Sequence, residues 1–220
     1  MAISKANFNS FNVTPTASKF ITFNSSNNGL AADDVGGALQ LISTTTASSS
    51  STVTITSGID STYKEYIIKL INIHGSANYT TFGINFSIDG GSNYNATKTT
   101  TSFTNYHSEN DSYASFGYSS GTDIAQGTGY QQLNIGDNTG IDDDESLSGM
   151  IHLFDPSSSF VKHFMSRVHM VSGSGSPHSV DGFVAGYVNS TSAVNAVDFK
   201  FASGTVDSGI IKMYGVSKWS

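Results

Sequence analysis

The feature that most constrains this chain is a succession of short apolar segments, each bounded by Gly, Ser, Asn or Asp clusters, from residue 52 onward. Segments of this length, rich in β-branched and aromatic residues, are typical of strands. No helical period occurs among them, so crossover helices are not expected. Such a pattern predicts an all-β fold, a jelly-roll-like antiparallel β-sandwich over residues 52–220. The predicted strands are residues 52–56, 64–74, 79–88, 95–103, 112–118, 130–135, 147–154, 160–171, 180–188, 196–201 and 209–216.

Side-chain parity predicts which faces of these strands are buried. Phe82, Ile84 and Phe86 alternate with smaller or polar residues, and Val197 to Phe201 alternates in the same way. Both segments are therefore expected to have one buried and one wetted face. The segment from Lys64 to Ile73 is apolar on both sides, which fits a central strand covered on both faces or a strand packed against a neighbouring subunit.

One segment, Leu30 to Ile42, has a helical pattern instead. Ala31, Val35, Ala38 and Ile42 recur at steps of four, three and four, which predicts a short helix at about residues 31–43. Two interior glycines cost such a helix about 1 kcal/mol each relative to alanine, and a helix this short is marginal alone. The polar tracts on either side offer no apolar surface, so we expect it to pack against copies of itself or another protein.

The segments around this helix predict an N-terminal anchoring region, residues 1–51. Residues 1–29 are polar with isolated apolar side chains, which fits an extended docking arm or a disordered tail, and Phe20 to Phe23 could pair as a short strand. The Ser/Thr-rich tract at residues 43–52 has the composition of a flexible linker. The residues predicted to dock or oligomerise are Phe8, Phe11, Phe20, Phe23, Val35, Ala38, Leu41 and Ile42.

Composition excludes several classes of function. The net charge is −7 and the ten Lys and Arg residues are scattered, which argues against binding to nucleic acid or to anionic membranes. The chain has no cysteine, and no apolar run is long enough to span a membrane. The first twenty residues lack the apolar stretch of a secretory signal, so we expect synthesis in the cytoplasm without export. Only 12% of residues are charged, which predicts a neutral polar surface of the kind found outside cells or on particles.

The sequence contains no convincing catalytic constellation. The six histidines lack metal-binding spacing, and no GxSxG element is present, so we expect no enzymatic activity. The acidic run at residues 136–146 carries oxygen ligands suited to Ca²⁺, although consecutive acids in one loop also arise simply because they are solvated. The calcium candidates are Asp142, Asp143, Asp144 and Glu145. No other cofactor is predicted.

The stretch from Phe103 to Tyr130 mixes aromatic rings with amides and carboxylates. Proteins use this mixture to stack on sugar rings and to bond their hydroxyl groups. The alternative is that these aromatic residues are ordinary strand and edge residues. The residues predicted to contact a glycan are Tyr106, Asn110, Tyr113, Tyr118 and Tyr130.

Three patches resemble a known family, the phage virion structural proteins of tail-fibre and capsid-appendage type. Ser87 to Tyr94, SIDGGSNY, resembles a turn that closes an early hairpin of their jelly-roll domain, and Asp89 with two glycines suits a tight hairpin. Ser203 to Val216, SGTVDSGIIKMYGV, resembles their C-terminal turn and last strand. The segment from Leu30 to Ile42 resembles a helix that lies near a trimeric junction in those proteins, although Gly36 and Gly37 depart from its pattern.

The resemblance implies a non-enzymatic virion protein, a tail fibre, head fibre or capsid decoration protein. It would form a homotrimer, bind other capsid or tail proteins through its arm, and expose a β knob for attachment to a host-surface glycan. A lectin-like carbohydrate-binding module is the alternative class, and a tailspike-type glycan depolymerase is a third. Light scattering separates the first two, because the lectin-like module is expected to be monomeric.

Overall fold

The computed structural model describes residues 20–23, 30–33, 38–173 and 177–216, and for the first two of these ranges it describes the backbone alone. The chain divides into two compact units, residues 1–38 and 39–220. In the first unit, β1 (Phe20–Phe23) pairs antiparallel with β2 (Leu30–Asp33), with Phe20 opposite Asp33 and Phe23 opposite Leu30. The short strand predicted at residues 20–23 is therefore confirmed.

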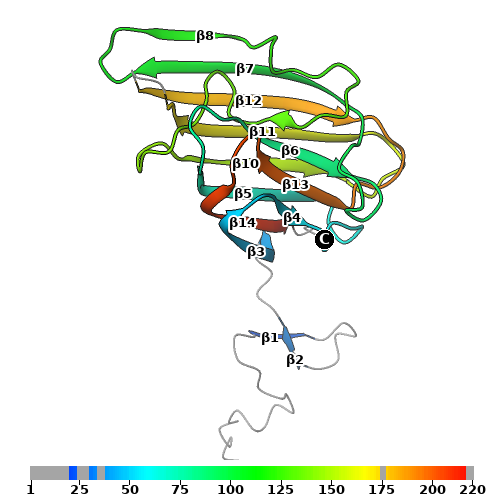
Figure 1. Cartoon of the computed structure of the whole chain (residues 1–220). Helices are drawn as coiled ribbons and strands as arrows, with labels where there is room; N and C mark the ends of the chain where they lie inside the picture. The colour runs from blue at the N-terminus through cyan, green and yellow to red at the C-terminus, as the bar shows by residue number, and fades with distance from the viewer. Residues whose placement is uncertain (1–19, 24–29, 34–37, 174–176, 217–220) are drawn as a thin grey trace, which may run out of the picture. The chain divides into compact units, whose positions relative to one another are not determined.

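The second unit is an all-β sandwich of two antiparallel sheets, as the sequence predicts (Figure 1). The large sheet has eight strands in the order β3-β14-β5-β10-β11-β12-β7-β8, and the small sheet has four in the order β4-β13-β6-β9. The strands are β3 (Leu39–Ser50), β4 (Val53–Ile55), β5 (Glu65–Gly75), β6 (Phe82–Ser87), β7 (Lys98–Ser108), β8 (Ala114–Tyr118), β9 (Gln131–Gln132), β10 (Leu147–Phe154), β11 (Lys162–Val171), β12 (His178–Val188), β13 (Ala196–Phe201) and β14 (Val206–Val216).

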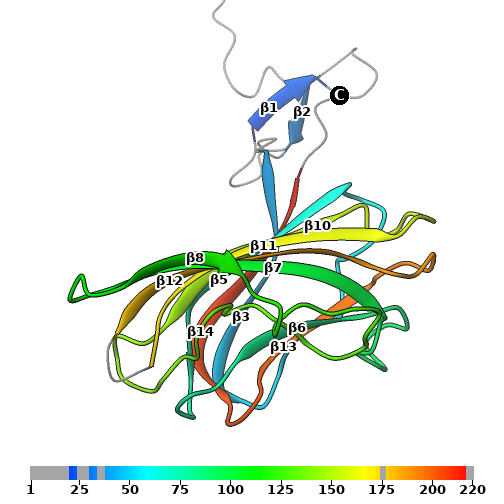
Figure 2. The same ribbon diagram turned by 90° about the horizontal axis from the view of Figure 1, so that it is seen from above.

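The chain passes repeatedly between the two sheets, an arrangement compatible with a jelly-roll-like fold. Strands β4, β6, β9 and β13 of the small sheet each lie in sequence between strands of the large sheet. Figure 2 shows the two layers, with the large sheet above β6 and β13. No helix in the described part of the chain is long and apolar enough to cross a membrane.

Aromatic side chains fill the space between the layers. In β11, Phe164 and Val168 point inward and alternate with outward residues, the period-2 pattern of a strand with one covered face. The Phe164 ring lies 4.8 Å from that of Phe86 in β6, centroid to centroid, and thus connects the two sheets. Phe82 stacks on Phe199 of the adjacent strand β13 at 6.0 Å.

The predicted helix at residues 31–43 is wrong. Its first residues form β2, and from Leu39 onward the chain forms β3, while Val35, Gly36 and Gly37 lie outside the described residues. Strand β3 pairs with β14 along almost its whole length, from Leu39 opposite Val216 to Ser50 opposite Val206. A short helix with interior glycines would have only marginal stability, whereas this ladder gives the backbone of residues 39–50 regular hydrogen bonds.

The Ser/Thr tract is also part of β3 and not a linker. Residues 43–50 form most of this strand, with Ala47 buried against the core. Threonine is β-branched and favours strands, and without β3 one edge of β14 would lack a hydrogen-bonding partner. The sandwich unit thus begins at Leu39 and not near residue 52.

Two predictions about faces and turns need correction. The outer side chains of Asn85 and Ser87 in β6 and of Asp198 in β13 are buried and not wetted, whereas Lys200 in β13 is half-buried. The turn in Ser87 to Tyr94 has positive φ at Gly90 and Gly91, as expected, but it does not close a hairpin. It leads from β6 of the small sheet to β7 of the large one, since β6 pairs with β13 and β9.

Strand β5, for which the sequence left two interpretations, is central in the large sheet. It lies between β14 and β10. Tyr66, Ile68 and Leu70 are buried between the layers, whereas Ile67 and Ile71 on the outer side are half-buried. Ile67 and Ile71 therefore contribute apolar surface to the outer face of this sheet.

Candidate functional site

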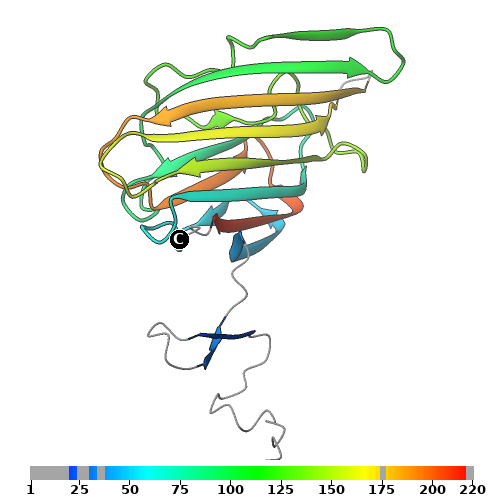
Figure 3. The ribbon, with the colours of Figure 1, turned by 180° about the vertical axis from the view of Figure 1, so that it is seen from behind.

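The candidate site is the outer face of the large sheet, here called the open face. Figure 3 shows this sheet from the outer side, with its strands side by side and without a described element in front of them. The side chains on this face are the outward residues of each strand, such as Met165 and Arg167 in β11 and Phe103 in β7. Large apolar residues among them are unusually exposed, including Phe116, Tyr118, Met150, Met165 and Leu41. Exposed apolar groups on one face mark binding surfaces.

Four side chains form a row across the edge strand β8 and the strands β7, β12 and β11. This row, here called the aromatic row, consists of Phe116, Phe103, Phe183 and Arg167. Phe103 stacks on Phe183 at 4.6 Å between centroids with an interplanar angle of 11°, and Phe116 packs against Phe103 at 5.6 Å. The Arg167 guanidinium lies 5.1 Å from the centre of the Phe183 ring. Phe116 is nevertheless 71% exposed, so the row presents flat apolar surface to solvent.

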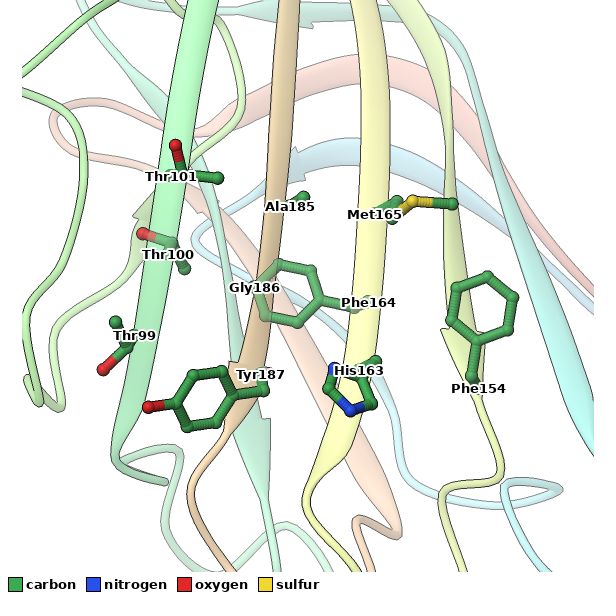
Figure 4. Close-up of a pocket in the computed structure, with 10 residues that line it drawn as sticks. All are labelled: Thr99, Thr100, Thr101, Phe154, His163, Phe164, Met165, Ala185, Gly186 and Tyr187. Atoms are coloured by element: carbon green, nitrogen blue, oxygen red, sulfur yellow. The ribbon is translucent and has the colours of Figure 1, made fainter.

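Beside this row lies a hollow of about 380 Å³, shown in Figure 4. The surface is lowered at its centre because Ala185 and Gly186 of β12 have little or no side chain. Larger groups surround it, with Tyr187 and His163 on one side at 6.3 Å between ring centroids. The full lining consists of Thr99, Thr100, Thr101, Phe154, His163, Phe164, Met165, Ala185, Gly186 and Tyr187.

The strand register explains why the hollow forms there. Thr101 pairs with Ala185, and Ala185 pairs with Met165, so a small residue lies between two larger ones in one row across β7, β12 and β11. In the next row, Thr99 pairs with Tyr187, which pairs with His163. Hydroxyl groups from β7 therefore line one side of the hollow, and apolar and aromatic groups line the other (Figure 4).

Some charged groups on this face are paired, whereas Lys69 of β5 and Lys212 of β14 lie opposite each other as register partners. Arg167 donates two hydrogen bonds to Asp181, from Nη2 at 2.7 Å and from Nε at 3.1 Å, and this interaction raises the pKa of the guanidinium. His152 and Glu65 are in contact at 2.5 Å. A surface with hydroxyl groups and flat rings suits a ligand that has apolar faces and hydroxyl groups.

The structure places the five predicted glycan contacts at separate positions. Tyr106 and Tyr113 lie together, 5.3 Å between centroids with their hydroxyl oxygens 3.4 Å apart, and with His178 and Asp137 they line a second hollow of about 270 Å³. Tyr118 lies on the open face and donates a hydrogen bond to Asp123. The other two residues lie outside the strands of the large sheet. Tyr130 bonds Asp198 of the small sheet, and Asn110 accepts a bond from Ser112 N within its own turn.

The predicted docking residues are only partly described. Phe8, Phe11 and Val35 lie outside the described residues, and Phe20 and Phe23 belong to β1, whose side chains are likewise outside them. Of the residues assigned to a helical stripe, Leu41 is exposed on β3, Ile42 packs against the core, and Ala38 is exposed just before that strand. They therefore do not form a single helical face.

The acidic loop uses its one buried carboxylate for its own structure. Glu145 is buried, and its Oε2 accepts a hydrogen bond from Asp142 N at 3.1 Å, whereas Asp142, Asp143 and Asp144 are exposed. Within the described residues, no group of three His, Asp or Glu side chains is arranged to hold a metal ion.

Sequence reasoning missed the main residues of the open face, namely Phe103, Phe154, His163, Phe183 and Tyr187, as binding residues. Their signal was present in the alternation of β7, β10, β11 and β12, because aromatic residues occupy outward positions where polar residues are the norm. Comparisons with protein-family models, with curated proteins and with solved structures find no match to this chain.

Proposed function

We propose that this protein is a non-enzymatic virion surface protein that attaches to carbohydrate on its host through the open face. The observation that carries the attachment role is the combination of the aromatic row with the hollow beside it. Flat exposed rings stack on the apolar faces of sugars, while Thr99, Thr101 and Tyr187 offer hydroxyl groups at the rim.

The virion assignment is supported by the resemblance of Ser87 to Tyr94 and Ser203 to Val216 to phage appendage proteins, together with the weakly charged surface. In this proposal residues 1–38 anchor the protein to capsid or tail proteins and bring three chains together. Three sandwiches side by side would then bind a repeating polysaccharide with several weak contacts at once. Trimerisation predicts a particle of about 70 kDa in light scattering, three times the chain mass of 23.2 kDa.

Binding is tested with the purified full chain on an array of bacterial surface polysaccharides. The double variant Phe103→Ala and Phe116→Ala should lose at least about tenfold in affinity, because each exposed ring contributes on the order of 1 kcal/mol to stacking. Phe160→Ala is the matched control, since Phe160 is 78% exposed but lies in the loop between β10 and β11. Equal losses in the double variant and the control, or binding unaffected by the double variant, would refute the assignment of the open face.

A lectin-like module is the second candidate function, because such a module would bind carbohydrate through the same open face. It differs in assembly and not in ligand. A chain that binds polysaccharide but remains a 23.2 kDa monomer at micromolar concentration, and that antibodies do not detect on virus particles, supports the module and contradicts the virion protein.

A further inference from the structure

Lys98, the first residue of β7, has a fully buried side chain. Its Nζ donates hydrogen bonds to Asn85 Oδ1 at 2.7 Å and to Ala96 O at 3.1 Å, so neither acceptor is a carboxylate. A buried ammonium without a counter-ion is unfavourable. Burial lowers the pKa of Lys98 to about 8, so about a tenth of the side chain is a neutral, nucleophilic amine at pH 7.

The amide group facing this amine is held firmly in place. Asn85 of β6 is 1% exposed, and its Nδ2 donates to Tyr94 O at 2.5 Å and to Thr128 O at 3.0 Å. These two bonds fix which end of the amide points to Lys98. Because the C=O bond is about 1.23 Å long, Nζ lies no more than about 3.9 Å from the carbonyl carbon Cγ. Oδ1 also accepts a bond from Phe86 N at 3.0 Å, which polarises the carbonyl group.

A buried carboxyl group shares the face of Asn85. The Cα atoms of Asp198 and Asn85 are direct partners in the β13–β6 register, so both side chains project to the same side of the small sheet. Asp198 Oδ2 accepts a bond from Tyr130, whereas its Oδ1 is buried and has no hydrogen-bond partner among the described residues. Burial raises the pKa of Asp198, which favours the protonated form that can donate a proton.

We propose that Lys98 and Asn85 form an intramolecular isopeptide bond that connects the large sheet to the small one. The lone pair of Nζ attacks Cγ of Asn85, and the Nζ–Cγ bond forms. The Cγ–Nδ2 bond then breaks, and Nδ2 leaves as ammonia after receiving a proton from the attacking amine, relayed by the carboxyl group of Asp198. The products are a secondary amide and one ammonia molecule, so the step needs no oxidant and no cofactor. Fixed proximity of the two groups supplies the rate acceleration.

The chain itself provides a clean test by trypsin digestion of the unfolded wild-type protein. Lys98 is the one Lys or Arg between Lys69 and Lys162 in the sequence. An isopeptide bond removes the charge that trypsin recognises at Lys98. Residues 70–162 should then remain a single peptide, about 17 Da lighter than its sequence mass because ammonia is lost. Release of residues 70–98 at their sequence mass would refute the proposal.

Lys162 is the internal control, because its side chain is also fully buried but donates to the backbone oxygen of Ser190 at 2.9 Å and not to an amide side chain. Cleavage after Lys162 should be complete. Asn85→Ala should restore cleavage after Lys98 and the full mass, and persistence of the lighter peptide would contradict Asn85 as the acceptor. Asp198→Asn should lower the cross-linked fraction, and complete cross-linking in that variant would exclude Asp198 from the proton transfer.

Discussion

Replacing Phe164 by Ala should reveal how strongly the sandwich depends on contact between its sheets. Phe164 of β11 is 1% exposed, and its ring lies 4.8 Å from that of Phe86 in the other sheet. Truncation of a fully buried Phe removes its transfer free energy and leaves a cavity, which together cost about 3–5 kcal/mol. For a unit of this size each kcal/mol lowers Tm by roughly 2–4 °C, so Tm should fall by about 6–20 °C.

The assay is urea unfolding followed by circular dichroism, with the m-value compared between variants so that a stability change is distinguished from a change in the unfolded state. Phe116→Ala is the matched control, because this Phe is 71% exposed on the open face and its loss should change the free energy of unfolding by no more than about 1 kcal/mol. A cost below about 1 kcal/mol for Phe164→Ala, or equal costs for both variants, would refute the described packing of the two sheets.

Three further predictions concern the turn, the last strand and the N-terminal unit. Hydrogen bonds from Asn93 and Ser87 lower the pKa of Asp89 to about 2, below its ordinary 3.8, so its stabilising contribution should be present above pH 3.8 and be lost as the pH falls toward 2. Between pH 5 and 2, the free energy of unfolding should therefore change less with pH in Asp89→Asn than in the wild type. Equal pH dependence in the two proteins would contradict this. Gly215→Val should cost about 1–3 kcal/mol in urea unfolding, because a Cβ there would lie 2.3 Å from the Tyr63 ring, and a neutral effect would contradict that packing. Deleting residues 1–38 should leave Tm unchanged while light scattering reports a single chain, and a persistent trimer would place the assembly contacts in the sandwich.

Much of the fold could be predicted because its signals are local. Every segment predicted as a strand from residue 52 onward overlaps a strand, and β10 and β13 have the predicted bounds. Their apolar runs end at turn clusters, which a single sequence shows directly. The last strand β14 and the positive φ of Gly90 and Gly91 follow from the same local chemistry.

The errors concern segments whose structure depends on distant partners. Strand β3 has a sequence that is polar in its second half and helix-like in its first, and its identity comes from pairing with β14, more than 150 residues away. The outer face of β6 looked wetted because polar residues occupy it. Loops bearing Tyr94 and Thr128 cover that face and bond Asn85.

The candidate site likewise has features that the sequence predicts and features that depend on the tertiary structure. The sequence by itself identified a sandwich, a weakly charged surface and an excess of aromatic residues among hydroxyl and amide groups. Only the tertiary structure decided which aromatic residues share the open face, and it brought Lys98 against Asn85. The physical reason is that alternation along one strand fixes parity within that strand, whereas the register between strands and the cover from the second sheet fix which side chains meet and which remain exposed.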